Sequence, residues 1–234
     1  MKKHCFKLAN ARQFLFALIL SFTYCSVDGQ NLCERYGDTN TDIIILQGAN
    51  SSQFPNIDGL KVKVLGDFII TESRTFTDVI FEFGTNGRIL GGIDNLHFVN
   101  CKLYSCTDSW KGIVFDAIVS STIVNKYFQF RDCDLESYIQ IVTTNANFSA
   151  GRTNFYSNNY TGAEAANLHV KTTISSDLSN TAYFICNFYS SGFDWVKVTG
   201  PAINTALPGV SFTTCTFIDL GSNAIVSENC DFNV

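Results

Sequence analysis

The hydrophobic positions of this chain recur in a short pattern: an aromatic residue, two further residues, a cysteine or small residue, one polar residue, and then Leu or Phe. Clear copies run from Phe98 to Leu103, from Phe130 to Leu135, from Tyr183 to Phe188 and from Phe212 to Phe217. Looser copies lie between Ala150 and Phe155 and between Ser227 and Phe232. Repetition of one unit is typical of a solenoid, in which each unit buries its hydrophobic face against its neighbours.

The copies are unevenly spaced along the chain. Their central positions fall at residues 101, 133, 153, 186, 215 and 230, so the intervals are 32, 20, 33, 29 and 15 residues. Uneven intervals suit a parallel β-helix, whose turns vary in length while the inward strand positions stay in register. The last interval is short for a whole coil, so we expect Cys230 to lie on a different face from Cys215. The alternative is an antiparallel sandwich whose strands merely have similar sequences.

The segments between the turns have the composition of short strands. Apolar or alternating runs, such as 79–83, 96–98, 113–115 and 128–130, are bounded by Gly, Asn, Asp and Ser. The chain has 21 Phe, 9 Tyr and only 3 Pro, a composition that favours strands. The sequence therefore predicts an all-β fold, a parallel β-helix over residues 60–234 whose cysteine and phenylalanine columns form the core. Residues 30–60 are predicted to form a short N-terminal cap, in which residues 43–46 cover the first coil.

The first 29 residues have the pattern of a secretory signal peptide. Basic residues precede the apolar run 14–20, and a small-residue cleavage site follows with Val27 at position −3 and Gly29 at position −1. The apolar run is too short for a membrane anchor, which needs about 20 residues. Cys25 is a poor lipoprotein site because the bulky Tyr24 precedes it. We therefore expect a secreted or cell-surface protein without a membrane span.

Charge and cysteine content narrow the classes of partner. Cleavage after Gly29 leaves 12 basic and 20 acidic residues, and no basic patch is visible, which disfavours nucleic acid and anionic membranes. Seven cysteines remain, so they cannot all pair. The cysteines of the repeat column are expected to be small buried core residues, whereas Cys101 and Cys106 are the predicted local disulfide. No Cys-x-x-Cys pair is present, so zinc is not expected.

Reactive side chains do not gather into a recognisable catalytic, cofactor or metal site in the sequence. Asp132, Asp134 and Glu136 alternate along one predicted strand, so we expect them to share a face directed away from the core. Such a row can act on a sugar or bind calcium, but on an acidic surface it is more often only solubilising. His97 and His169 lie in apolar strands and are expected to be structural.

Other motifs are only weak indications of a calcium site, a sugar contact or glycosylation. The segment 38–42 begins like a calcium loop but lacks the glycine and the distal glutamate, so we interpret it as a solvated turn. Trp110 and Trp195 are candidates for aromatic contact with a sugar and equally for packing between coils. N-glycosylation sequons, which matter only in a eukaryotic secretory route, begin at Asn50, Asn147 and Asn159.

The stretch from Arg88 to Ile113 resembles the parallel β-helix segments of large bacterial surface proteins exported by the type IX route. In those segments an Asn-Cys strand is followed by a Trp-x-Gly-Ile step, as at Asn100-Cys101 and Trp110-Lys-Gly-Ile113 here. The resemblance implies a right-handed, pectate-lyase-like superhelix and extracellular or outer-membrane placement. The chain has no recognisable C-terminal sorting domain and stops after a repeat copy. Because an uncapped coil exposes a strand edge, end-to-end self-association is an expected interaction.

These observations leave two main classes of function. The favoured one is a non-catalytic secreted or cell-surface β-helix with an adhesive, structural or glycan-contacting role and no cofactor. The alternative is a polysaccharide lyase or glycoside hydrolase of the same superfold. The catalytic strands of such enzymes carry Asp-Asp or His-Gly steps that are missing here, and Asn40-Thr-Asp42, a step of the pectin-hydrolysing members, stands alone. A third class, ice binding, requires a Thr-x-Thr ladder, whereas the pairs at Thr143-Thr144, Thr172-Thr173 and Thr213-Thr214 are adjacent residues in different coils.

Overall fold

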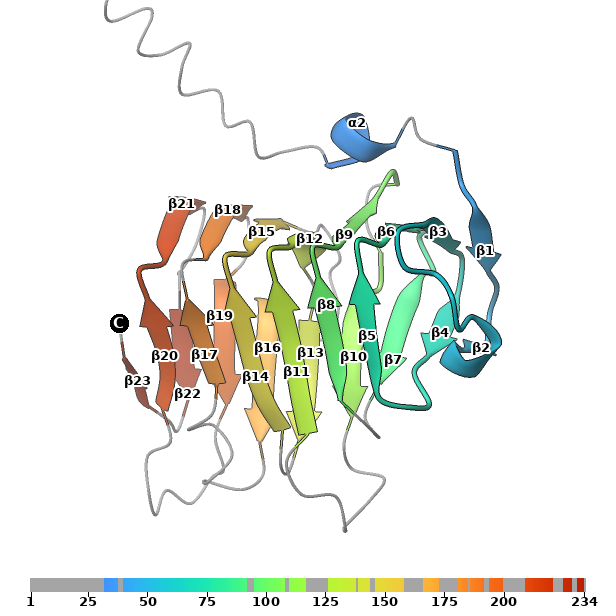
Figure 1. The fold of residues 1–234 in the computed structure, drawn as a ribbon. Helices are drawn as coiled ribbons and strands as arrows, with labels where there is room; N and C mark the ends of the chain where they lie inside the picture. The colour runs from blue at the N-terminus through green and yellow to red at the C-terminus, as the bar shows by residue number, and fades with distance from the viewer. Residues whose placement is uncertain are drawn as a thin grey trace, which may run out of the picture.

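In the computed structural model the chain winds repeatedly through three parallel β-sheets (Figure 1). The structure describes residues 32–37, 40–91, 95–107, 110–116, 126–137, 139–143, 146–157, 166–172, 181–184, 186–191, 194–199, 209–220, 225–228 and 231–233. The predicted signal peptide and the sequon at Asn159 lie outside these residues. Helix α2 (Leu32–Tyr36) precedes the first strand, and a 3-10 turn, η1 (Ser51–Gln53), follows the second.

Each sheet takes one strand from each successive coil of the chain. Sheet A contains β1 (Ile43–Ile45), β3 (Lys61–Val64), β6 (Ile80–Phe83), β9 (Lys102–Ser105), β12 (Asp134–Ser137), β15 (Asn154–Ser157), β18 (Asn187–Ser191) and β21 (Thr216–Leu220). Sheet B contains β2 (Ala49–Asn50), β4 (Asp67–Ile69), β7 (Arg88–Gly91), β10 (Ile113–Asp116), β13 (Ile139–Thr143), β16 (Ala166–Thr172), β19 (Asp194–Thr199) and β22 (Ile225–Glu228). Sheet C contains β5 (Arg74–Thr77), β8 (Leu96–Val99), β11 (Lys126–Arg131), β14 (Ala146–Gly151), β17 (Thr181–Phe184), β20 (Gly209–Thr213) and β23 (Asp231–Asn233).

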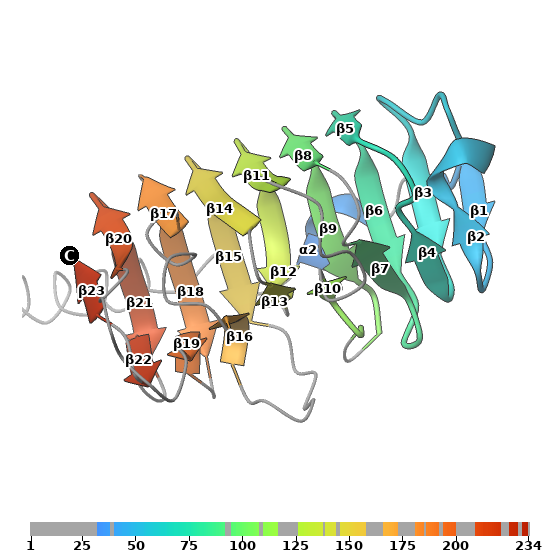
Figure 2. The ribbon, with the colours of Figure 1, turned by 90° about the horizontal axis from the view of Figure 1, so that it is seen from below.

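Neighbouring strands in every sheet are parallel and come from adjacent coils, which confirms the predicted parallel β-helix. Figure 2 shows the coils stacked along one axis, from β1 and β2 at one end to β23 at the other. The repeat pattern marks the passage from sheet C to sheet A in each coil. Phe98 lies on β8, Cys101 lies in the bend, and Leu103 lies on β9. The repeat therefore identified the same structural position in successive coils.

The core is built from columns of like residues that point inward from the sheets. Phe98 lies in register with Phe76 on one side and Phe130 on the other, and all three are fully buried. Cys101, Cys133 and Cys186 form part of the bend column and are buried, as expected for core residues of this column. Because parallel strands repeat one backbone geometry, each column repeats one side-chain environment from coil to coil.

The bend between sheet C and sheet A contains a residue in the left-handed region immediately before the column position. These residues are Asp78, Asn100, Asp132, Arg152 and Thr214, with φ between 48° and 58°. Asn and Asp tolerate this region better than most side chains. The bends also bond to one another: Asn100 Nδ2 donates to Asp78 Oδ1, and Arg152 donates to both carboxylate oxygens of Asp132. At three of these five positions, an Asp or Asn therefore suits the conformation that the bend adopts.

Replacing Asn100 with valine will lower the free energy of unfolding by about 1–2 kcal/mol, because a β-branched residue is strained at φ 53°. Asn100→Gly is the matched control, since glycine adopts this conformation without strain and loses only the exposed bond to Asp78. Urea unfolding of both variants measures the difference. Equal stability of the two variants would show that backbone strain is not what selects asparagine here.

The two ends of the described solenoid have features of their own. Within the predicted cap, Ile43–Ile45 form β1, which pairs in parallel with β3 and extends sheet A. Ile45 faces the core while Ile44 is exposed, as strand alternation requires. The copy from Ser227 to Phe232 joins β22 of sheet B to β23 of sheet C, whereas the other copies join sheet C to sheet A. Its flanking strands therefore lie at a different part of the coil from Cys215, in agreement with the short interval. Cys230 itself lies outside the described residues.

Candidate functional site

Helix α2 lies against the outer face of sheet A, where it contacts β9 and β12. Figure 1 shows the helix outside the solenoid, on the sheet A side. Leu32 is only 2% exposed and belongs to a small cluster with Tyr104 and Tyr156, separate from the main core. A helix of five residues is not stable alone in water. The contacts with sheet A and the covalent link described next therefore hold it in place.

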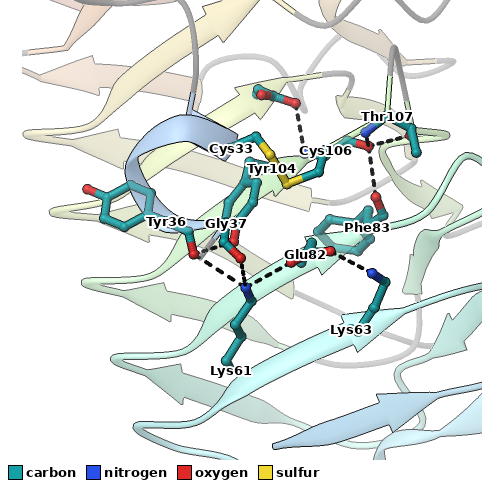
Figure 3. The surroundings of a disulfide bond; sticks show 12 residues. Cys33, Tyr36, Gly37, Lys61, Lys63, Glu82, Phe83, Tyr104, Cys106 and Thr107 are labelled. Atoms are coloured by element: carbon teal, nitrogen blue, oxygen red, sulfur yellow. Dashed lines mark hydrogen bonds and ion pairs between the residues drawn. A yellow bond between two sulfur atoms is a disulfide. The ribbon is translucent and has the colours of Figure 1, made fainter. Parts of the chain in front are cut away.

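A disulfide joins α2 to the segment that follows β9. It links Cys33 to Cys106, 73 residues apart (Figure 3). The predicted pairing of Cys101 with Cys106 is wrong. β9 lies between these two residues and places Cys101 in the core, where its Sγ donates to the carbonyl of Phe76 at 3.3 Å. Cys106 lies at the outer side of the sheet, within reach of α2.

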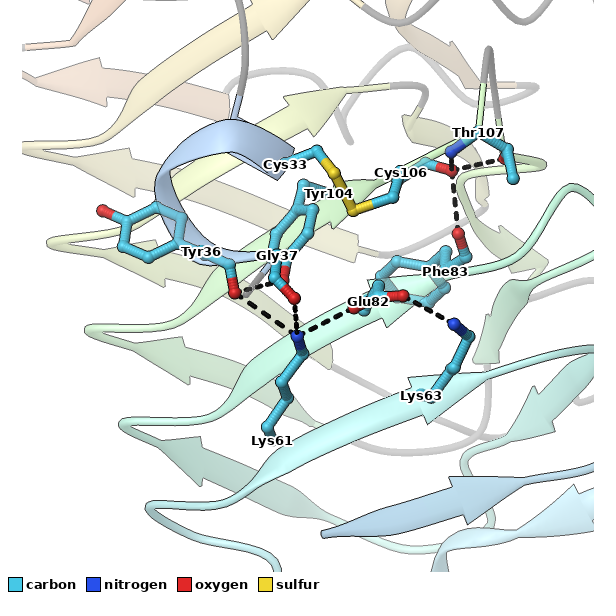
Figure 4. Close-up of polar contacts among 11 residues, drawn as sticks. Cys33, Tyr36, Gly37, Lys61, Lys63, Glu82, Phe83, Tyr104, Cys106 and Thr107 are labelled. Atoms are coloured by element: carbon cyan, nitrogen blue, oxygen red, sulfur yellow. Dashed lines mark hydrogen bonds and ion pairs between the residues drawn. A yellow bond between two sulfur atoms is a disulfide. The ribbon is translucent and has the colours of Figure 1, made fainter. Parts of the chain in front are cut away.

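Two side chains of sheet A bond to the C-terminal end of α2 (Figure 4). Lys61 Nζ donates to the carbonyls of Tyr36 at 3.3 Å and Gly37 at 2.9 Å. The Tyr104 hydroxyl donates to the same Tyr36 carbonyl at 3.0 Å. The last carbonyls of a helix lack intrahelical partners, and a cation there also interacts favourably with the helix dipole. Sheet A therefore supplies the C-terminal cap that this short helix needs.

Lys61 is part of an ion cluster beneath α2. Its Nζ lies 2.9 Å from Glu82 Oε2, and Lys63 Nζ lies 2.7 Å from Glu82 Oε1. Burial by itself raises the pKa of Glu82, but the bonds from the two ammonium groups outweigh it and hold that pKa below its ordinary value. Because Lys61 and Glu82 are almost fully buried, removal of either would leave an uncompensated charge.

Asp134 is the second buried carboxylate under α2. It lies 3.1 Å from Lys102 Nζ and accepts bonds from Asn154 Nδ2 at 2.7 Å and from the Tyr36 hydroxyl at 3.0 Å. Burial raises the pKa of Asp134, but these donors together lower it below its usual value. A further bond from Asn187 Nδ2 to Asn154 Oδ1 continues the polar ladder to β18. The carboxylate is thus fully engaged in joining α2 to the sheet.

The predicted outward row of Asp132, Asp134 and Glu136 does not exist as one solvated face. Asp132 lies in the bend, where it pairs with Arg152 at 2.6 Å, and Asp134 is only 7% exposed. Glu136 accepts a bond from the backbone N–H of Ser105 at 2.9 Å, and desolvation raises its pKa to about 8. The prediction failed for Asp132 because this residue lies in the bend before β12. It failed for Asp134 because the strand pattern contains no information about α2, which covers that residue.

Replacing Gly37 with alanine will weaken the docking of α2. A Cβ at this position would clash with the Cys33 carbonyl oxygen, at 2.4 Å. It would also crowd the two disulfide sulfur atoms, with Cys33 Sγ at 3.0 Å and Cys106 Sγ at 3.1 Å. We expect a loss of about 1–3 kcal/mol, measured by thermal unfolding of the oxidised protein. Gly84→Ala is the control, because its nearest neighbour is the mobile end of Leu65 at 3.3 Å. A Gly37→Ala protein as stable as the control would contradict this account.

The remaining predicted site residues are dispersed. Trp110 is fully buried and stacks on Phe83 with ring centroids 3.9 Å apart, so it is a packing residue and not a sugar contact. The side chains of Trp195 and His169 lie outside the described residues. Asp42, from the predicted calcium-like turn, accepts a bond from the Lys61 backbone N–H at 2.8 Å. Within the described ranges no group of three or more His, Cys, Asp or Glu side chains is placed to hold a metal ion.

Sheet C offers a further candidate surface on its outer face. A row of polar side chains in register crosses it, and this row consists of Thr75, His97, Gln129 and Ser149. All four are exposed or half-buried. Burial, and then the charge of Arg131, lower the pKa of His97, so its imidazole is mainly neutral at pH 7. Tyr127, at the start of β11, is 48% exposed beside this row. We call this surface the sheet C face.

The chain was compared with family models, with curated proteins and with solved structures, and none of them matches it. None of the described helices is long and apolar enough to cross a membrane.

Proposed function

We propose that this protein is a non-catalytic β-solenoid, secreted or held at a cell surface, whose sheet C face contacts polysaccharide or adheres to another surface component. The observation that carries the proposal is the row of polar side chains in register on the sheet C face. Its strands repeat about every 4.8 Å, so like polar groups meet a long ligand at regular intervals. Tyr127 adds an exposed aromatic ring of the kind that packs against sugars.

Two observations support export of the chain. The Cys33–Cys106 disulfide is typical of proteins that mature in an oxidising compartment. The N-terminal 29 residues have the pattern of a signal peptide, and residues 88–113 resemble segments of exported bacterial surface proteins. Intact-mass and peptide mass spectrometry of the exported protein tests this: we expect an N-terminus at Gln30 and a peptide pair joined through Cys33 and Cys106. Retention of residues 1–29 would contradict it.

A polysaccharide array tests the contact with glycans. The exported chain is applied to immobilised polysaccharides, and retention and product release are read on the same wells. We expect retention without release, and we expect Tyr127→Ala and Gln129→Ala to weaken it. Lys63→Ala, on the outer face of sheet A, is the matched surface control. Retention that responds to Lys63→Ala but not to the sheet C variants would overturn the assignment of the sheet C face.

One observation favours the alternative, a polysaccharide lyase or glycoside hydrolase. Asp134 and Glu136 lie two residues apart on β12, and their environments move their pKa values in opposite directions, as in a general acid with an ionised partner. Against it, Asp134 is covered by α2 and bonded to Tyr36. Release of reducing or unsaturated ends on the array, abolished by Glu136→Gln, would replace the non-catalytic proposal with this one.

A further inference from the structure

Helix α2 and Gly37 together form a short strap over sheet A. Leu32 is its fully buried apolar residue, whereas Glu34 and Arg35 are exposed. Tyr36 packs on Tyr104 with ring centroids 6.0 Å apart. Hydrogen bonds to the strap come from Lys61 and Tyr104, and Asp134 accepts one from it. A five-residue helix contributes little stability by itself. The Cys33–Cys106 disulfide therefore supplies an attachment that the side-chain contacts do not replace.

The groups beneath the strap keep partners within sheet A when the strap is removed. Lys61 remains bonded to Glu82, and Glu82 remains bonded to Lys63. Asp134 remains bonded to Lys102 and Asn154. Departure of the strap therefore leaves no buried charge without a counter-charge. Since an unpaired buried charge is strongly destabilising, its absence keeps the cost of departure low.

The hydrophobic core lies on the other side of sheet A from the strap. Val62, Phe81 and Leu103 point inward from β3, β6 and β9, and all are fully buried. They contact the phenylalanine columns and do not belong to the cluster around Leu32. An element that packs outside the main core, as the strap does, can open locally without global unfolding.

We propose that α2 is a redox-controlled strap: the oxidised chain covers the polar outer face of sheet A, and reduction of Cys33–Cys106 releases α2 while the solenoid stays folded. A dithiol reductant breaks the Sγ–Sγ bond, each sulfur takes up one electron and one proton, and the reductant becomes a disulfide. The released state presents Lys61, Glu82 and Asp134 to solvent. This inference does not depend on the proposed function, because it concerns sheet A and not the sheet C face.

Lysine acylation of the exported protein, with and without dithiothreitol, tests the strap. Lys61 is 4% exposed and lies under α2, whereas the side chain of Lys63, on the same strand, is 38% exposed and serves as internal reference. We expect reduction to increase labelling of Lys61 by an N-hydroxysuccinimide ester on the order of tenfold relative to Lys63. Iodoacetamide applied to the same sample should label Cys33 and Cys106.

Two variants separate strap release from unfolding. The double variant Cys33→Ser with Cys106→Ser should label at Lys61 without reductant, and Cys215→Ser, which removes a cysteine away from the strap, should behave like the unaltered protein. Cys101 and Cys133 report on the core, because both are buried. Lys61 that stays protected after reduction would overturn the proposal. Labelling of Cys101 and Cys133 together with Lys61 would also overturn it, because the solenoid would then unfold with the strap.

Discussion

Replacing Phe98 with alanine will lower the free energy of unfolding by about 3–5 kcal/mol, the range for truncation of a buried phenylalanine. Its ring stacks on Phe130 with centroids 4.9 Å apart and planes at 3°, and it contacts Phe76 with centroids 5.4 Å apart. The residue is 1% exposed, so the cavity left by its side chain has no access to solvent. Because neighbouring coils fix the backbone on both sides, the site cannot collapse to fill the space. Urea unfolding of the oxidised protein measures the loss.

The control for this experiment is an aromatic residue of the same sheet that points outward. Tyr127 is 48% exposed at the start of β11, so we expect Tyr127→Ala to change stability by less than about 0.5 kcal/mol. Phe98→Leu, which retains part of the volume, should give an intermediate loss. A loss in Phe98→Ala no larger than that in Tyr127→Ala would show that the phenylalanine column is not the core that stabilises the solenoid.

The sequence allowed prediction of the fold because its strongest pattern reports backbone geometry. An inward aromatic on sheet C, a small residue in the bend and an inward Leu or Phe on sheet A recur because each coil repeats the same path. Asn100 and Asp132 carry a second signal, since the bend requires a residue that tolerates positive φ. Thr153 at a column position shows that a loose copy of the pattern still marked a true bend.

The surroundings of α2 could not be predicted in the same way. The pairing of Cys33 with Cys106 depends on where a short helix docks, and no periodicity in the strands specifies this position. The same docking buries Asp134, which the alternation along its strand places on an outer face. Leu32 and Tyr36 are a weak indication of a helix at this position, because two apolar or aromatic residues four positions apart can form one face of a helical turn. Contacts between elements distant in sequence determine both the disulfide pairing and the burial of Asp134.

Replacing Glu136 with glutamine will raise the free energy of unfolding at pH 8–9 by on the order of 2–4 kcal/mol and change it little at pH 4. Desolvation raises the pKa of Glu136 from 4.5 to about 8, so the folded protein holds a proton that the unfolded chain releases. The contribution of this group to stability is therefore complete below pH 4.5 and is lost as the pH rises toward 8. Glutamine does not titrate, and its Oε1 keeps an acceptor for the Ser105 N–H.

The pH profile distinguishes this effect from a general gain in stability. Urea unfolding at a series of pH values from 4 to 9 should give curves for Glu136→Gln and the unaltered protein that coincide at low pH and diverge between pH 5 and 8. Glu34→Gln removes an exposed carboxylate from α2 and serves as the matched control. A constant difference between Glu136→Gln and the unaltered protein across the whole range would contradict ionisation as its cause. Divergence at high pH would instead establish Glu136 as a carboxyl that the fold keeps protonated beside the ionised Asp134.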